Sequence, residues 1–216
     1  MPADPVLDAD AATEAVPESA KRRQILDGAR RVFFAQGFDA ASMGEIAREA
    51  GVSKGTLYVY FDSKEALFGA LIADSRRAAA ERMVELDPDA PDMTAMLVAH
   101  CTALIEKLGA PEHVAMVRMV IGVSEKFPAL SHAFYEAGPA FGRRRLSAYI
   151  EAQQARGRLR ADADSELAAW QLAGMCCHPV MVHVVLADLP PPGPERIRAY
   201  AESAVATFMA AYGTAA

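Results

Sequence analysis

The chain has 216 residues, of which 52% are hydrophobic, 23% charged and only 7% aromatic, and its formal net charge is −6. A chain of this length forms one or two domains with a sizeable core, and its richness in alanine, leucine, valine and methionine favours helix over sheet. The three cysteines, Cys101, Cys176 and Cys177, form no C-x-x-C pair, so we expect a reduced cytoplasmic protein and not a disulfide-rich secreted one.

The charge is unevenly distributed along the chain. Residues 1–19 carry five acidic and no basic side chains and lack the basic and apolar regions of a signal peptide, so we predict a disordered acidic tail. Residues 20–77 carry ten basic and seven acidic side chains, whereas residues 78–216 carry twelve and sixteen. Only the second segment is basic, which is typical of a nucleic-acid-binding head on an acidic body.

The first elements in chain order are predicted to be short helices. Apolar residues recur at helical spacing from about Ala20, and Gly37 can adopt the positive φ that ends such a helix. Ser42 and Glu45 then form a capping box, which predicts a second short helix. That helix should end at Gly51, the residue best able to turn the chain.

Helices continue to the end of the chain. Ser53 can cap a third helix over Lys54 to Tyr60, and a fourth is predicted from Asp62-Ser63-Lys64-Glu65 to about Glu85. Glycine and proline breakers then separate helical runs at 93–108, 111–125, 128–156, 164–187 and 194–212. The sequence contains no strand pattern, so we predict an all-α protein of about nine helices.

The stretch Gly51-Val52-Ser53-Lys54-Gly55 fits two different patterns. As G-x-S-x-G it matches the nucleophile elbow of a serine hydrolase, in which a strained strand-to-helix turn exposes the serine hydroxyl. Here a predicted helix, GEIAREA, precedes Ser53, and no histidine lies nearby in the sequence. We therefore predict no catalytic residues and no enzyme, although the hydrolase interpretation remains an alternative.

The same residues fit the turn of a helix-turn-helix, and that interpretation explains more of the sequence. Ala47 is small where two helices must cross, and Gly51 turns the chain between them. If Leu57 and Phe61 point inward at i, i+4, the opposite face of the third helix faces outward. That outer face presents Lys54, Gly55, Thr56, Tyr58 and Val59. We predict that it enters the major groove of DNA.

Residues 20–67 resemble the N-terminal domain of the TetR (tetracycline repressor) family of bacterial regulators. The resemblance is carried by RRQILDGARRVFFAQGFDAASMGEIAREAGVSKGTLYVYFDSKEAL, which contains the family's A-G-V-S-x-G-x-L-Y turn and its Y-F-x-x-K-E-x-L join. The rest is similar in being helical, and FPALSHAFYEAG and ARGRLRADADSELAAWQL are similar to one C-terminal subgroup. The resemblance implies a helix-turn-helix DNA-binding domain at 20–66, joined to a helical ligand-binding and dimerisation domain at 67–216.

The resemblance also implies roles for individual residues. Base contacts are implied for Lys54, Gly55 and Thr56, and phosphate contacts for Ser42, Tyr58, Tyr60 and Lys64. Val59 departs from the family pattern, because many members have an aromatic or polar residue there. The chain contains no asparagine to read adenine, whereas Thr56 and Val59 could each meet a thymine methyl group.

The run from Leu167 to Ala187 is 21 residues long and mostly apolar. Its length is compatible with a membrane span, but polar residues interrupt it and its neighbours are acidic, without a basic anchor. A soluble helix that is apolar all round must be covered on every side. We therefore predict no membrane segment and a homodimer formed through the last two long helices, 164–187 and 194–212.

Two further features of the body have plain interpretations. Cys176, Cys177, His178 and His183 could suggest a metal site, but the histidines are five residues apart and Pro179 interrupts their helix, so we predict no metal and no cofactor. A metal or thiol sensor on the same scaffold remains an alternative. Arg143-Arg144-Arg145 points in three directions on a helix and is predicted to form a solvated face.

The function that these observations predict is a ligand-responsive repressor that leaves a palindromic operator when a small apolar or aromatic effector binds. Flexible methionines, the single tryptophan and an isolated histidine suit a mainly apolar pocket with few polar anchors. The candidate lining residues are Met96, His100, Leu104, Met116, Met119, Val123, Phe134, Trp170 and Met175. We expect effector binding to move the fourth helix and to spread the two recognition helices.

Overall fold

The structure is a computed structural model that describes residues 18–80 and 85–214. Every regular element in these residues is a helix, and one isolated β-bridge joins Leu159 to Gly213. The all-α prediction is therefore confirmed. The predicted acidic tail, except for its last two residues, and the end of the predicted fourth helix after residue 80 lie outside the described residues.

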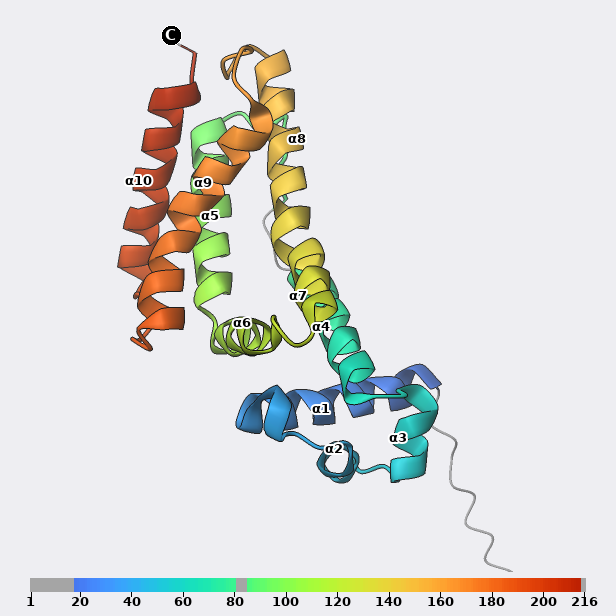
Figure 1. Cartoon of the computed structure of the whole chain (residues 1–216). Helices are drawn as coiled ribbons and strands as arrows, with labels where there is room; N and C mark the ends of the chain where they lie inside the picture. The colour runs from blue at the N-terminus through green and yellow to red at the C-terminus, as the bar shows by residue number, and fades with distance from the viewer. Residues whose placement is uncertain (1–17, 81–84, 215–216) are drawn as a thin grey trace, which may run out of the picture.

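Three helices form a head at one end of the molecule (Figure 1). They are α1 (Glu18–Ala40), α2 (Met43–Glu49) and α3 (Lys54–Tyr60). α1 is interrupted at Gly37, where φ is 79°, and Gly51 turns the chain after α2 with φ 65°. Both glycines thus take the positive φ that the sequence predicted for them.

The remaining helices form a body. α4 (Lys64–Ala80) rises from the head, and α5 (Met93–Gly109), α8 (Phe141–Ala155), α9 (Ser165–Val180) and α10 (Pro194–Tyr212) run along the body (Figure 1). α6 (Pro111–Val123) lies across the end of the body nearest the head, and α7 (Pro128–Tyr135) follows it. A core cluster of residues from α5, α6, α8, α9 and α10 holds the body together.

Two of the long predicted helices contain a π-helical segment. The run 128–156 consists of α7, the π-helix η1 (Glu136–Ala140) and α8, and the run 164–187 consists of α9 and the π-helix η2 (Met181–Leu186). Pro139 lies inside η1, and Pro179 lies two residues before η2. Because proline lacks an N–H and clashes with the preceding turn, it disrupts the regular α-helical pattern. Both runs are thus helical throughout, as predicted, and each contains a π-helical segment at or just after a proline.

The core of the head extends into the body. The rings of Phe33, Phe38 and Phe68 pack with centroids 5.2 to 5.7 Å apart, which brings the start of α4 into the head. The same buried cluster includes Met116, Val120 and Val123 of α6 and Leu130 of α7. α6 and α7 therefore pack directly on the head, so that a movement of either helix acts on it.

The segment Ser165–Leu186 is 22 residues long, with a mean hydropathy of 1.3 over its most apolar stretch. By length and composition alone it could cross a membrane, but a core helix passes the same test. It packs against α5, α8 and α10, and five of its residues in α9 are buried there.

Candidate functional site

The third helix is held so that one face is buried and the other is free. Leu57 is fully buried in the head core, while Tyr58 is 49% and Val59 81% exposed. Ser53 caps the helix, because its Oγ accepts a hydrogen bond of 3.0 Å from the backbone N–H of Thr56. A second bond of 2.8 Å joins Ser53 Oγ to Thr56 Oγ1. The outer face of α3 is thus fixed before any partner binds.

The position of Ser53 does not suit a nucleophile elbow. The preceding element is α2, which ends at Glu49, and Ser53 begins α3, so the strand-to-helix turn that defines an elbow is missing. Its hydroxyl is used to cap the helix. The G-x-S-x-G sequence is therefore explained by helix capping.

Ser42 and Lys54 lie on the same side of the head. Ser42 forms the predicted capping box with Glu45, in which its Oγ accepts from the Glu45 N–H and its own N–H donates to the Glu45 carboxylate. The bonds to Ser42 lower the pKa of Glu45. Lys54 Nζ and Ser42 Oγ lie 3.1 and 4.0 Å from the position that a Cβ on Gly44 would occupy. The missing side chain of Gly44 leaves room for Lys54 to lie across α2.

Lys64 is engaged inside the protein. Its Nζ donates to the carbonyl oxygens of Phe38, Asp39 and Ala41 at 2.7, 3.2 and 3.0 Å, and it lies 4.5 Å from the centroid of the Phe38 ring. An ammonium group has three N–H donors, and three carbonyls accept from this one. The geometry therefore does not favour the predicted phosphate contact. Tyr60 is half-buried against the head core.

The nine candidate effector residues fall into separate surroundings. Met96, His100, Leu104 and Met175 belong to the body or pack on its core. Met116, Met119 and Val123 belong to the head cluster, and Phe134 contacts both clusters. Trp170 is half-exposed on α9. Phe134 is therefore the candidate best placed to connect a bound molecule in the body with the head.

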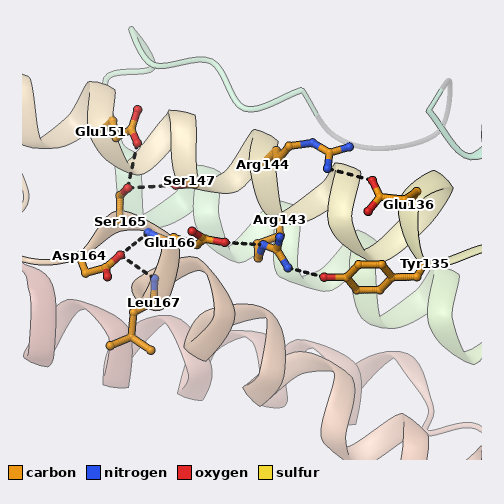
Figure 2. A network of polar contacts seen from close by, with 10 residues as sticks. All are labelled: Tyr135, Glu136, Arg143, Arg144, Ser147, Glu151, Asp164, Ser165, Glu166 and Leu167. Carbon is orange, nitrogen blue, oxygen red and sulfur yellow. Dashed lines mark hydrogen bonds and ion pairs between the residues drawn. The ribbon is translucent and has the colours of Figure 1, made fainter. Parts of the chain in front are cut away.

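Arg143 departs from the predicted solvated face. Its side chain is only 16% exposed, and its Nε lies 3.3 Å from Glu166 Oε1. It also donates a 2.8 Å hydrogen bond to the hydroxyl of Tyr135, and its guanidinium lies 4.8 Å from the centroid of the Trp170 ring. Figure 2 shows Arg143 between Tyr135 and Glu166, while Arg144 points to the exposed carboxylate of Glu136. The solvated environment predicted for the three arginines therefore fits Arg144 and does not fit Arg143.

A second arginine ties α6 to the end of η2. Arg118 donates to the carbonyl oxygens of Val184 and Val185 at 2.8 and 3.1 Å, and to Asp188 Oδ1 at 2.8 Å. The last carbonyls of a helix lack partners within it, so a side chain that binds them stabilises the helix end. Asp188 has φ 55°, the one positive value for a non-glycine residue among the described residues.

The sulfur and histidine residues of α9 and η2 do not form a ligand cluster. Among residues 18–80 and 85–214, no three His, Cys, Asp or Glu side chains are grouped to hold a metal ion. His178 and His183 are exposed, whereas Cys176 is buried. A hydrogen bond with Cys101, together with burial, raises the pKa of Cys176, and burial raises the pKa of Cys177 to about 11. Thiols with raised pKa values are poor nucleophiles and poor metal ligands.

Comparison with known protein families identifies the chain. Residues 25–71 match the family model described as bacterial regulatory proteins, tetR family. Residues 95–214, more than half of the chain, match the model described as AefR-like transcriptional repressor, C-terminal domain. The chain belongs to the TetR family. Members of this family are transcriptional regulators, which agrees with the helical head and with the resemblance seen in the sequence.

Individual TetR-family proteins show how far the similarity extends. A putative TetR-family regulator from Mesorhizobium loti is 27% identical, with a TM-score of 0.84 over 93% of this chain and 100% of that one. The flavonoid-responsive regulator FrrA is 31% identical, with a TM-score of 0.79 over 92% of this chain and 100% of that one. The repressor Rv1474c of Mycobacterium tuberculosis is 46% identical over 63 residues, 29% of this chain. That match spans about a third of the relative's own length, 34%.

Sequence reasoning missed contacts that depend on tertiary packing. α1 approaches the end of α2 closely at Gly28, where an added Cβ would lie 2.6 Å from the Cβ of Ala50, the C-cap of α2. Gln24 donates a 2.6 Å bond to the Ala50 carbonyl and so caps α2. The close packing at Gly28 had one signal in the sequence, because a glycine inside a helix often marks close packing. The bond from Gln24 had no such signal.

Proposed function

We propose that the protein is a homodimeric repressor whose two α3 helices read a palindromic operator and whose body binds a small apolar or aromatic effector. The observation that carries the proposal is the outer face of α3, which is exposed, rigidly capped and placed on a basic head. A fixed, exposed helix face can enter the major groove without reorganising first. A cytoplasmic location follows for a regulator of this kind.

The proposed DNA contacts follow from the exposed side chains. Lys54, Gly55 and Thr56 would contact bases near the start of α3, and Ser42, Tyr58 and Tyr60 would contact phosphates. Lys54 lies across Gly44 of α2, on the same side of the head as Ser42, so a phosphate contact is a second possible role for its ammonium group. For Lys64 we propose a positioning role in place of the phosphate contact. Its ammonium group would hold the end of α1 against α4.

Dimerisation would cover the apolar outer side of α9 and η2. Exposed apolar side chains recur there at helical spacing, namely Leu167, Trp170, Val182 and Leu186. Gly174 lies between them with open space around it, which would let a partner helix approach closely. A two-fold dimer would place the recognition helices about 34 to 36 Å apart, or slightly wider, to read two half-sites.

Effector action would pass through α6 and α7 as well as α4. Phe134 contacts both cores, and Phe127, in the turn after α6, packs on Phe38 of the head with centroids 5.4 Å apart. A molecule that displaces α7 would therefore move the head. The similarity to the flavonoid-responsive FrrA supports an aromatic effector. Release of the operator requires that the effector bind the DNA-incompetent state of the protein more tightly than the DNA-competent state.

Selection from a random DNA library tests the proposal. The purified full chain should enrich a palindrome, and Thr56→Ala should weaken binding to that sequence by on the order of 1 to 3 kcal/mol at fixed salt. Ser53→Ala should retain the same sequence preference. Failure of the wild-type protein to enrich any sequence would refute the proposed function.

A further inference from the structure

Arg143 joins two parts of the molecule that have different partners. On one side it holds Tyr135, the last residue of α7, and α7 packs on α4. On the other side it holds Glu166 and Trp170 in the first turns of α9. The outer side of α9 carries the apolar residues proposed for the dimer interface. Arg143 therefore connects α7, which packs on α4, with α9, which would contact the second copy of the chain.

The π-helix η1 lies between the two residues of the main hydrogen bond. Tyr135 precedes η1 and Arg143 follows it by three residues, so the bond between them spans the whole segment. A π-helical turn with an internal proline interrupts the regular α-helical pattern, and helices bend at such places. The Tyr135–Arg143 bond therefore ties the residue before η1 to a residue after it (Figure 2).

We propose that Arg143 is a positioning residue that fixes where each DNA-binding head sits relative to the dimer interface, and thereby sets the spacing of the operator half-sites that the protein accepts. This inference rests on the proposed dimeric repressor. Arg143 lies outside the head and does not need to contact DNA or effector. It acts by holding α7 against α9 through one hydrogen bond, one ion pair and one cation–ring contact.

Operators with altered spacing provide the readout. One inserted base pair moves the second half-site by about 3.4 Å and rotates it by about 34°, so a dimer with fixed heads should lose on the order of tenfold in affinity. If the heads are no longer fixed, the dimer can adapt to several spacings. A purely structural role for Arg143 would lower stability without changing the ratio of affinities between spacings.

The experiment uses the palindrome selected by the full-length wild-type protein and variants of it that are one or two base pairs shorter or longer. Arg143→Met and Tyr135→Phe are compared with wild type, and Arg144→Met is the matched control, because Arg144 also bridges η1, to Glu136, but on the exposed side. Tyr135→Phe removes one oxygen atom and keeps the ring, so it tests the bond even if Arg143→Met folds poorly.

We expect both variants to reduce the preference for one spacing from about tenfold to less than about threefold, while Arg144→Met keeps the wild-type preference. Unchanged spacing preference in Tyr135→Phe and in folded Arg143→Met would overturn the inference and leave the repressor proposal standing. Equal loss of preference in Arg144→Met would also overturn it. If wild type bound no sequence specifically, the proposed function itself would fail.

Discussion

The Nζ atom of Lys64 lies 2.7 Å from the carbonyl oxygen of Phe38 and 4.5 Å from the centroid of the Phe38 ring. One side chain of α4 thus closes the last turn of α1, whose carbonyls would otherwise lack partners. Lys64→Ala should lower the free energy of unfolding by about 1 to 3 kcal/mol, because it leaves backbone carbonyls unpaired. Chemical denaturation measures this.

Lys126→Ala is the matched control for that variant. Lys126 is mostly exposed and makes one long ion pair, 3.6 Å, with Asp39 of the same turn, so its removal should change stability little. If Lys64→Ala were as stable as wild type but bound all DNA sequences more weakly, Lys64 would be a phosphate contact after all.

Substitutions at Thr56 separate its two groups. The hydroxyl is bonded to Ser53 Oγ at 2.8 Å, so the methyl group is the part available for a base. Thr56→Val keeps the methyl and should keep sequence preference, whereas Thr56→Ser should relax it by about 1 to 3 kcal/mol at one base pair. Competition binding with single-base operator variants measures both. The opposite order of effects would assign the base contact to the hydroxyl.

Ser53→Ala removes the cap of α3 and should cost about 0.5 to 2 kcal/mol of stability. Its effect on DNA affinity should be the same for specific and random sequences, because the cap orders the helix without touching a base. A hydrolase would lose ester-cleaving activity in this variant. We expect the wild-type protein to show no ester-cleaving activity, so Ser53→Ala should cause no change in it.

The proposed dimer interface can be tested with a charge. Leu186 is 72% exposed at the end of η2 and is one of the apolar side chains proposed for the interface. Leu186→Glu should raise the dimer dissociation constant by at least about 100-fold, because a buried unpaired carboxylate costs several kcal/mol. Ile121→Glu, an exposed apolar residue on α6, is the control. Sedimentation profiles that are identical for both variants and wild type would place the interface elsewhere.

His113 should make stability depend on pH. Burial, with a smaller contribution from the charge of Lys107, lowers the pKa of His113 to about 4, and its ring packs beside Phe134. The unfolded chain therefore binds the proton first, so stability is complete above about pH 6.5 and falls by up to about 3 kcal/mol as the pH drops toward 4.

The pH dependence is assigned by comparing two leucine variants. His113→Leu should flatten the decline between pH 6.5 and 4.5, whereas His132→Leu, at an exposed histidine, should leave the wild-type slope. Unfolding titrations at each pH give the slopes. If His113→Leu left the slope unchanged, His113 would bind its proton equally well in the folded and the unfolded chain.

Arg118 should stabilise the end of η2. Arg118→Ala leaves the carbonyls of Val184 and Val185 without their partner, and we expect a loss of about 1 to 3 kcal/mol. Arg198→Ala is the control, because Arg198 is exposed and pairs with Glu202 one turn away on the same helix. Thermal unfolding that is unaffected in both variants would show that water replaces the guanidinium without cost.

Local patterns predicted the head well because its signals are local. The Ser42–Glu45 box, the Ser53 cap and the Gly51 turn each depend on residues within four positions, and all three are present. The roles of Arg143 and Lys64 could not be predicted in this way. Their partners Glu166 and Phe38 lie 23 and 26 residues away in the chain, and only tertiary packing brings them together.

The body was predicted less completely for the same reason. Helix periodicity predicted the ends of α5, α6 and α10 to within two residues. It could not show that Met116 and Val123 pack in the head core. Apolar residues on α6 look alike in the sequence whichever core they enter. The nine effector candidates therefore remain a prediction, and Phe134, which contacts both cores, is the first of them to test.

If the outer face of α3 lies in the major groove of a palindromic operator, a DNA-cleaving iron chelate attached to Val59→Cys should cut the DNA within that groove. Val59 is the most exposed large apolar side chain of the head, and the raised pKa values of Cys176 and Cys177 should direct labelling to the new thiol. Ala161→Cys, in the loop between α8 and α9 at the far end of the body (Figure 1), is the control. We expect two clusters of cleavage about one helical turn apart, or slightly wider, on the selected operator, and none from the control. Cleavage that is absent, uniform along the DNA, or equal from both positions would contradict it.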